Sequence, residues 1–178
     1  MDSNQNILEY IDSQNLWSET KVYKRNEFIK TKGSIDTNSY FIVEGSVRIF
    51  IHHEEEEKII RFGYKNSLVA ALDSFLTNEP SPFIIQAIKK TTVKVLKKKT
   101  FDKLMNTIPE MRNEWHRRLE ELALQQTERE IDILTNSPRE RYLRVLKRSP
   151  QLFQEIPNKY IASYLRMSPE TLSRMKKS

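Results

Sequence analysis

The sequence of 178 residues contains no cysteine, only three glycines and only three histidines. Without cysteine the chain can form neither disulfides nor thiolate metal sites, and a cysteine-ligated iron–sulfur cluster is excluded. No apolar run approaches the roughly 18 residues that a spanning helix requires, and no basic segment followed by an apolar one begins the chain as in a signal peptide. These absences predict a soluble protein that suits a reducing cytoplasm, contacts no membrane and carries no cofactor of its own.

Motifs that carry catalysis are also missing from the sequence. There is no phosphate-binding P-loop, no glycine-rich dinucleotide fingerprint and no nucleophile elbow. His52 and His53 precede the acidic run from Glu54 to Glu57, where a metal or general-acid cluster can be imagined, but such a loop tip is more often solvated. We therefore expect no enzyme, no catalytic residue and no metal ligand.

Charge is distributed unevenly along the chain. Residues 136–178 contain ten Lys or Arg and three acidic residues, a net charge of +7, whereas residues 1–135 contain 20 basic and 21 acidic residues. An excess of basic residues at one end of the chain is expected of a protein that neutralises nucleic-acid phosphates. Periodic apolar residues such as Tyr142, Ile161 and Leu165 lie among these charges, which favours a folded basic module over a solvated tail.

Two short helices joined by a tight turn are predicted within residues 158–178. Asn158 is a candidate cap for the first helix, and residues 168–170 (Ser-Pro-Glu) supply the cap, the first-turn proline and the acidic residue that favour a second helix start. Leu172 and Met175 would then face inward and leave polar side chains facing outward. The pattern indicates a helix-turn-helix, and the alternative is an ordinary helical hairpin that closes a small domain.

The residues before this motif are predicted to form mainly strands at first and then helices. An opening helix is predicted over residues 3–14, and short apolar runs separated by polar or glycine turns fill residues 21–96, as in a barrel or sandwich. Gly45 suits a hairpin turn and residues 52–56 a loop between two strands. The runs are residues 21–23, 28–30, 40–43, 47–51, 58–62, 83–85 and 92–96.

Three further helices are predicted after this β-rich part. A short one covers residues 100–107, and a long one of about 25 residues starts at Pro109. A capping box at residues 137–140 opens another that runs to about Arg148, which puts a domain boundary near residue 136.

The long helix carries an apolar stripe at spacings of three, four and seven residues. Its length and its charged flanks favour pairing with a second copy of the chain, as in a coiled coil. The alternative is that the stripe packs against the β-rich part of the same chain. The residues predicted to form the dimer contact are Met111, Trp115, Leu119, Leu122 and Gln126.

The order of the predicted elements resembles that of the Crp/Fnr family of transcription regulators over nearly the full chain, and two segments resemble motifs of the family. Residues 40–47 (YFIVEGSV) resemble a characteristic hairpin of the family's β-roll, and residues 161–174 (IASYLRMSPETLSR) resemble its DNA-binding signature. The residues that match the family's Ser-x-Glu-Thr-x-x-Arg pattern are Ser168, Glu170, Thr171 and Arg174.

This resemblance implies an α+β fold in three parts. Residues 1–108 would form a double-stranded β-helix, a jelly-roll-like domain of the cyclic-nucleotide-binding type that acts as a sensor. Residues 109–135 would form the long dimerisation helix, and residues 136–178 an all-α helix-turn-helix domain. The sequence ends directly after the second helix of that motif, where many family members continue, so weaker phosphate contact is expected.

The resemblance also implies the DNA-binding residues and the partners. Glu170 and Arg174 would read bases, since a carboxylate accepts from the cytosine amino group and a guanidinium donates to guanine. Ser168 and Thr171 would contact phosphates, and Ser173 and Lys177 share the outward face. The partners would be double-stranded DNA with a palindromic operator, a second copy of the chain, RNA polymerase, and an unknown small-molecule effector.

One segment departs from the family pattern, at residues 69–87, where the phosphate-binding cassette would lie. Ala70 and Ala71 stand in place of the Gly-Glu pair of cyclic-nucleotide binders, and Ser81 and Pro82 stand in place of the cationic Arg-Ser or Arg-Thr pair. The charge-assisted pair to a cyclic phosphate is then lost, worth about 1.5 to 3 kcal/mol. We expect a regulator that does not respond to cyclic AMP; the alternative is an orphan sensor or interaction module that acts through a small ligand or a protein partner rather than through DNA.

Overall fold

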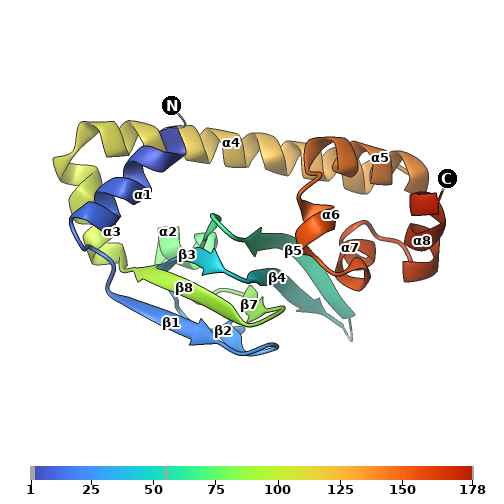
Figure 1. Ribbon diagram of the computed structural model, residues 1–178, viewed down its shortest axis with the longest axis horizontal. Coiled ribbons are helices and arrows are strands. Elements are labelled where there is room, and N and C mark those ends of the chain that lie inside the picture. The colour runs from blue at the N-terminus through green and yellow to red at the C-terminus, as the bar shows by residue number, and fades with distance from the viewer. Residues whose placement is uncertain (1–2, 55, 178) are drawn as a thin grey trace.

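The computed structural model describes residues 3–54 and 56–177, which form a β-roll, a long helix and a C-terminal group of helices (Figure 1). The strands are β1 (Glu19–Tyr23), β2 (Phe28–Lys30), β3 (Ser39–Glu44), β4 (Ser46–His53), β5 (Glu56–Tyr64), β6 (Leu68–Val69), β7 (Ile84–Ala87) and β8 (Thr91–Leu96). The helices are α1 (Ser3–Ser13), α2 (Leu72–Thr77), α3 (Lys98–Thr107), α4 (Pro109–Leu134), α5 (Pro138–Arg148), α6 (Leu152–Glu155), α7 (Asn158–Tyr164) and α8 (Pro169–Lys177). The predicted α+β fold, with a β-roll, a long helix and C-terminal helices, is confirmed.

Two four-stranded sheets make up the roll, with strand orders β1-β8-β3-β6 and β2-β7-β4-β5. All paired strands are antiparallel. Alternate side chains of both sheets point inward and exclude water, because successive residues of a strand face opposite sides. The core between the sheets consists of Tyr40, Ile42, Val47, Ile49, Val69, Ile85, Val93 and Val95.

The predicted hairpin turn at Gly45 is wrong, because β3 and β4 belong to different sheets and do not pair. Gly45 does adopt the positive φ expected of it, +96°, at the corner where the chain passes from one sheet to the other. The predicted loop at residues 52–56 is wrong in its bounds. His52 and His53 belong to β4, where they pair with Glu57 and Glu56 of β5; Glu55 lies outside the described residues. Cross-strand pairing places these histidines in a two-stranded ribbon, and among the described residues no group of three His, Cys, Asp or Glu side chains is placed to hold a metal ion.

A second core lies where α1, α3 and the start of α4 cover one end of the roll (Figure 1). Three aromatic rings meet there: the ring centroids of Phe101 and Trp115 are 4.8 Å apart, and those of Phe75 and Phe101 are 5.0 Å apart. Met111 is buried beside them. The first turns of α4 are thereby fixed to their own roll.

The C-terminal helices form a third core that reaches into the roll. Its buried members from the helices are Tyr142, Val145, Leu152, Ile156, Ile161, Ala162, Leu165 and Leu172. Ile88, from the loop after β7, belongs to the same core, and Phe62 and Tyr64 of β5 pack against it. The basic module therefore rests on strand β5, with α7 beside it (Figure 1).

Helix ends in this module follow local sequence at some positions but not at others. Ser137 caps α5 by accepting the Glu140 N–H at 3.3 Å, as predicted. The predicted cap at Asn158 is wrong, because α7 starts at Asn158 itself and the side chain accepts from Lys176 Nζ at 2.6 Å instead. None of the helices among residues 3–54 and 56–177 has the length and apolar character needed to cross a bilayer.

Candidate nucleic-acid interface and neighbouring cavity

Helix α8 is anchored on one face and exposed on the other. Ser168 caps it by accepting the Thr171 N–H at 3.2 Å, and the predicted proline stands in its first turn. Leu172 is fully buried and Met175 packs against the same core. Because i and i+3 side chains share a face, the outward face is left to the polar residues of the helix.

The polar residues of that face lie together and open to solvent. The N–H of Glu170 itself and the Ser168 hydroxyl hold the pKa of the Glu170 carboxyl below its ordinary value, so it is an ionised acceptor at neutral pH. Arg174 Nη2 lies 3.4 Å from Thr171 Oγ1, so the arginine and threonine present one surface. Ser173 is exposed on the same helix. The structure thus brings together four of the six predicted DNA-binding residues, Ser168, Glu170, Thr171 and Arg174, and places Lys177 in the last turn.

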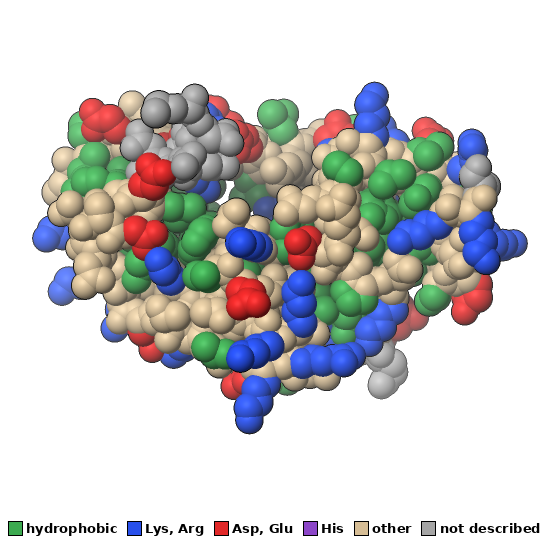
Figure 2. Space-filling model, in the orientation of Figure 1, with side chains coloured by type: hydrophobic (Ala, Val, Ile, Leu, Met, Phe, Trp, Pro, Cys, Tyr) green, Lys and Arg blue, Asp and Glu red, His purple; other side chains and the backbone are tan. Residues whose placement is uncertain are grey.

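Basic side chains accumulate at this end of the molecule. The last turn of α8 contains Arg174, Lys176 and Lys177, and Figure 2 shows Lys and Arg side chains at the end of the molecule that α8 forms. Cations at a helix C-terminus are also favoured by the helix dipole. The surface can hydrogen-bond bases through α8 and attract phosphates around it.

The turn between α7 and α8 is held by Arg141 of α5, which the sequence did not single out. The Arg141 guanidinium is buried and donates from Nε to the Leu165 carbonyl at 2.9 Å and from Nη2 to the Arg166 carbonyl at 3.2 Å. It also donates from Nη1 to the Thr135 carbonyl at 2.6 Å. One side chain thereby binds carbonyls at the start of the module and in the turn between α7 and α8. Its only sequence signal is a charge on the apolar face of a helix.

The predicted degenerate cassette offers no free cation to a phosphate. Ser81 is buried, and its hydroxyl accepts the Phe83 N–H at 3.1 Å. Lys30, which the sequence did not reveal, is also buried, and its ammonium donates to the carbonyls of Thr31, Ser81 and Phe83 at 2.9, 3.3 and 2.8 Å. The Lys30 ammonium is therefore already bound to three carbonyls.

The remaining cassette residues differ in where they lie. Ala70 lines a cavity, Ala71 is buried as the residue before α2, and Pro82 is exposed. None of the three brings a charge or a polar side chain that could bind a phosphate.

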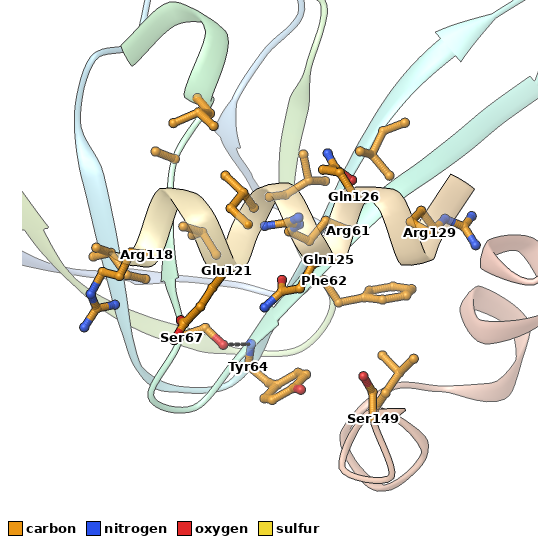
Figure 3. Close-up of a pocket in the computed structure, with 18 of the residues that line it drawn as sticks. Arg61, Phe62, Tyr64, Ser67, Arg118, Glu121, Gln125, Gln126, Arg129 and Ser149 are labelled. Atoms are coloured by element: carbon orange, nitrogen blue, oxygen red, sulfur yellow. Dashed lines mark hydrogen bonds between the residues drawn. The ribbon is translucent and has the colours of Figure 1, made fainter. Parts of the chain in front are cut away.

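The cavity lies between the roll, α4 and the C-terminal helices and has a volume of about 560 Å³. Strand β5 supplies Arg61, Phe62 and Tyr64, and α4 supplies Arg118 and Gln125 among others (Figure 3). Its size falls within the range of small-molecule pockets.

The predicted dimer stripe of α4 turns toward its own chain. Met111 and Trp115 pack in the core at the end of the roll, and Leu119, Leu122 and Gln126 line the cavity. Within one chain the stripe therefore packs against the β-rich part, which is the alternative to the predicted dimer contact. Met111 and Trp115 are left with little exposed surface for contact with a second copy.

Comparison with known families identifies the roll. A family model described as cyclic nucleotide-binding domain matches residues 20–108, half of the chain. No curated protein matches the sequence significantly.

Solved structures share the fold over nearly the whole chain. The catabolite activator protein of Thermus thermophilus is 20% identical, with 99% of this chain and 85% of that chain covered and a TM-score of 0.61. A CooA mutant from Carboxydothermus hydrogenoformans is 14% identical, with 96% and 82% covered and a TM-score of 0.74. The c-di-GMP responsive global regulator CLP of Xanthomonas campestris is 14% identical, with 96% and 90% covered and a TM-score of 0.70. At such identities the likeness describes a common fold.

Proposed function

The chain belongs to the cyclic nucleotide-binding domain family, and from that premise we propose that it is a cytoplasmic, homodimeric regulator of transcription that binds DNA through α8. The observation that carries the proposal is the exposed face of α8, where an ionised Glu170 and the guanidinium of Arg174 stand one helical turn apart. Solved structures of an activator protein and of a global regulator share the fold over nearly the whole chain, which supports a regulator over an enzyme.

The chemistry of the face favours sequence-specific reading of the major groove. A carboxylate accepts from the cytosine amino group and a guanidinium donates in bidentate fashion to guanine, each pair worth about 1 to 3 kcal/mol of discrimination. The hydroxyls of Ser168, Thr171 and Ser173 and the ammonium of Lys177 are donors of the kinds that bind phosphates. We assign Glu170 and Arg174 to bases and the others to the backbone.

A second exposed stripe of α4 suits the contact between two copies. Leu124, Ile131 and Leu134 are 68%, 40% and 71% exposed, and with Thr127 between them they repeat at spacings of three and four residues. That is the heptad pattern of a coiled-coil seam. We propose that a second copy covers this stripe, so that two α8 helices face successive major grooves about 34 to 36 Å apart and read a palindrome.

The same proposal excludes cyclic AMP as the effector. Supporting observations are that Lys30 is bound to three carbonyls and that residues 69–87 contain no Lys or Arg to pair with a cyclic phosphate. Isothermal titration calorimetry of the purified protein should detect no cyclic AMP binding at micromolar concentrations, and a clear micromolar isotherm would refute this part of the proposal.

Selection of bound fragments from sheared genomic DNA tests the function. At about 100 mM salt, where phosphate contacts still contribute strongly, the protein should enrich a palindromic motif that is the same with and without cyclic AMP. The double variant Glu170→Ala/Arg174→Ala should lose the motif. The matched variant Glu110→Ala/Arg112→Ala changes an exposed pair at the start of α4 and should keep it. An unchanged motif in the first variant, or no motif in the unmodified protein, would contradict DNA reading by α8.

A further inference from the structure

Two neighbouring turns of the roll carry a group of exposed cations. One turn, residues 24–27, joins β1 to β2, and the other, residues 88–90, joins β7 to β8. The turns lie side by side, because the Asn26 N–H donates to the Ala87 carbonyl at 2.8 Å and Tyr23 pairs with Thr91 at the strand ends. Their exposed cations, which we call the turn cluster, are Lys24, Arg25, Lys89 and Lys90.

Few acidic groups compensate the turn cluster. Glu27 is the one acidic residue of the two turns, and it accepts the backbone N–H of Lys24 at 2.7 Å. Lys89 pairs with Glu155 of α6 at 3.3 Å. Within residues 3–54 and 56–177, no carboxylate forms an ion pair with the other three cations of the cluster. Figure 2 shows Lys and Arg side chains gathered over the turn between β1 and β2.

The acidic run at the tip of the β4–β5 ribbon is remote from the turn cluster. Val47, at the start of β4, pairs with Ala87 beside the cluster, whereas the acidic run follows His53 at the other end of the same strand. Six residues of a strand span about 20 Å, and solvent-exposed charges that far apart are largely screened. The ribbon therefore does not neutralise the cluster.

Contacts between the roll and the basic module place the turn cluster close to the last turn of α8. Glu155, the partner of Lys89, precedes Asn158 by three residues, which span at most about 10 Å. The Asn158 side chain in turn accepts from Lys176 of α8 at 2.6 Å. Ile88 of the cluster's second turn is buried in the core of the module, which holds the two surfaces together. Cations thus continue from the end of α8 onto the roll.

We infer that the turn cluster binds backbone phosphates of the duplex that flanks the site read by α8. The inference rests on the proposed function and extends its DNA surface from the C-terminal helices to the roll. One duplex turn is about 34 to 36 Å long, so phosphates extend well past the end of a helix seated in the major groove. A lysine or arginine that binds one of them releases a counterion and adds affinity without reading sequence.

Salt-dependent binding of a mixed-sequence duplex of about 60 base pairs tests the inference. The triple variant Lys24→Gln/Arg25→Gln/Lys90→Gln removes three charges of the cluster. The pair between Lys89 and Glu155 stays in place. Fluorescence anisotropy from about 50 to 200 mM salt gives the affinity of the full chain and its slope against the logarithm of the salt concentration. The variant should bind at least about tenfold more weakly at 100 mM salt, and its slope should be shallower by at least about 1.

A matched variant separates the turn cluster from net charge. Lys97→Gln/Lys99→Gln/Lys103→Gln removes three exposed lysines around the start of α3, at the end of the roll far from α8 (Figure 1). The change of charge is the same, but affinity and slope should stay as in the unmodified protein. In the genomic selection the cluster variant should still enrich the unmodified protein's motif, because phosphate contacts carry no sequence information.

The outcomes distinguish this inference from the proposed function. Unchanged affinity and slope in the cluster variant would overturn the inference, leave reading by α8 standing and assign the cluster to another partner, such as an acidic protein surface. Equal losses in both triple variants would also overturn it, because net charge alone would then explain the effect. Failure of the unmodified protein to bind any duplex would overturn both.

Discussion

At the scale of single residues, the corner between β3 and β4 depends on the missing side chain of Gly45. A Cβ there would lie 2.4 Å from Thr91 Oγ1 and 2.5 Å from the Lys90 carbonyl oxygen. Hydrogen bonds hold the strands this close, because Thr91 Oγ1 accepts the Ser46 N–H at 3.2 Å and its hydroxyl donates to the Lys89 carbonyl at 2.8 Å. The chain crosses from one sheet to the other at this point.

Replacement of Gly45 by alanine should therefore destabilise the roll strongly. Positive φ costs an alanine about 1 to 2 kcal/mol, and the close contacts add about 1 to 3 kcal/mol of overpacking. Gly33→Ala is the matched control, because Gly33 also has positive φ but no atom lies within 4 Å of its added Cβ. Urea unfolding should give a larger loss of unfolding free energy for Gly45→Ala, and equal losses would contradict the steric argument.

Residue-level prediction from sequence worked where a residue's partner is close in sequence. The caps at Ser137 and Ser168 bond to N–H groups three residues away, so local sequence contains both partners. Asn158 failed as a cap because Lys176, 18 residues later, takes its oxygen. Lys30 and Arg141 bond to carbonyls brought near only by folding, which no local pattern reveals.

At the scale of elements, an ion cluster joins α4 to α5. Asp132 of α4 is fully buried and accepts from Arg144 Nε at 3.0 Å and from Arg148. Glu128, one turn earlier and partly exposed, accepts from Arg144 Nη2 at 2.8 Å. The long helix is thereby connected to the first helix of the basic module.

Asp132→Asn should weaken this junction far more than Glu128→Gln. Removal of the buried charge leaves two guanidiniums with one exposed partner, which costs about 3 to 5 kcal/mol, whereas an exposed pair is worth about 0 to 1 kcal/mol. The free energies of unfolding of both variants, measured in urea, check the difference. Similar small losses for the two would mean that Asp132 contributes no more than a surface charge.

Elements long enough to show a period were predictable, and the shortest were not. The strands rich in β-branched residues and the helices α3, α4 and α5 follow from alternation, spacing and caps, but β6 has two residues and α6 has four. Helix α4 posed a different difficulty, because it carries apolar residues on two faces. Leu119 and Leu122 face the cavity while Leu124 and Ile131 are exposed, so the period alone could not assign one stripe to the dimer.

At the scale of the whole molecule, the basic module is docked on the roll through aromatic side chains. The ring centroids of Phe62 and Tyr164 are 5.5 Å apart, and the Arg48 guanidinium lies 4.9 Å from the ring of Tyr160. Arg48 is itself held by Glu57 and Gln86 of the roll. The position of α7 therefore depends on its contact with the surface of β5. Because a short turn joins α7 to α8, the position of α8 depends on the same contact.

Ile88 makes this coupling measurable, because it comes from the roll yet is buried in the core of the basic module. Ile88→Ala should lower the free energy of unfolding by about 2 to 5 kcal/mol. The destabilised part should be the basic module. In hydrogen–deuterium exchange, amides of α5 and α7 should exchange at least tenfold faster, which corresponds to about 1.4 kcal/mol of local opening, while those of β3 and β8 should keep their rates. Ile85→Ala, in the core between the sheets, should show the reverse pattern. Faster exchange confined to the strands in the Ile88 variant would mean that the module is stable without the roll, and that the pose of α8 does not depend on this contact.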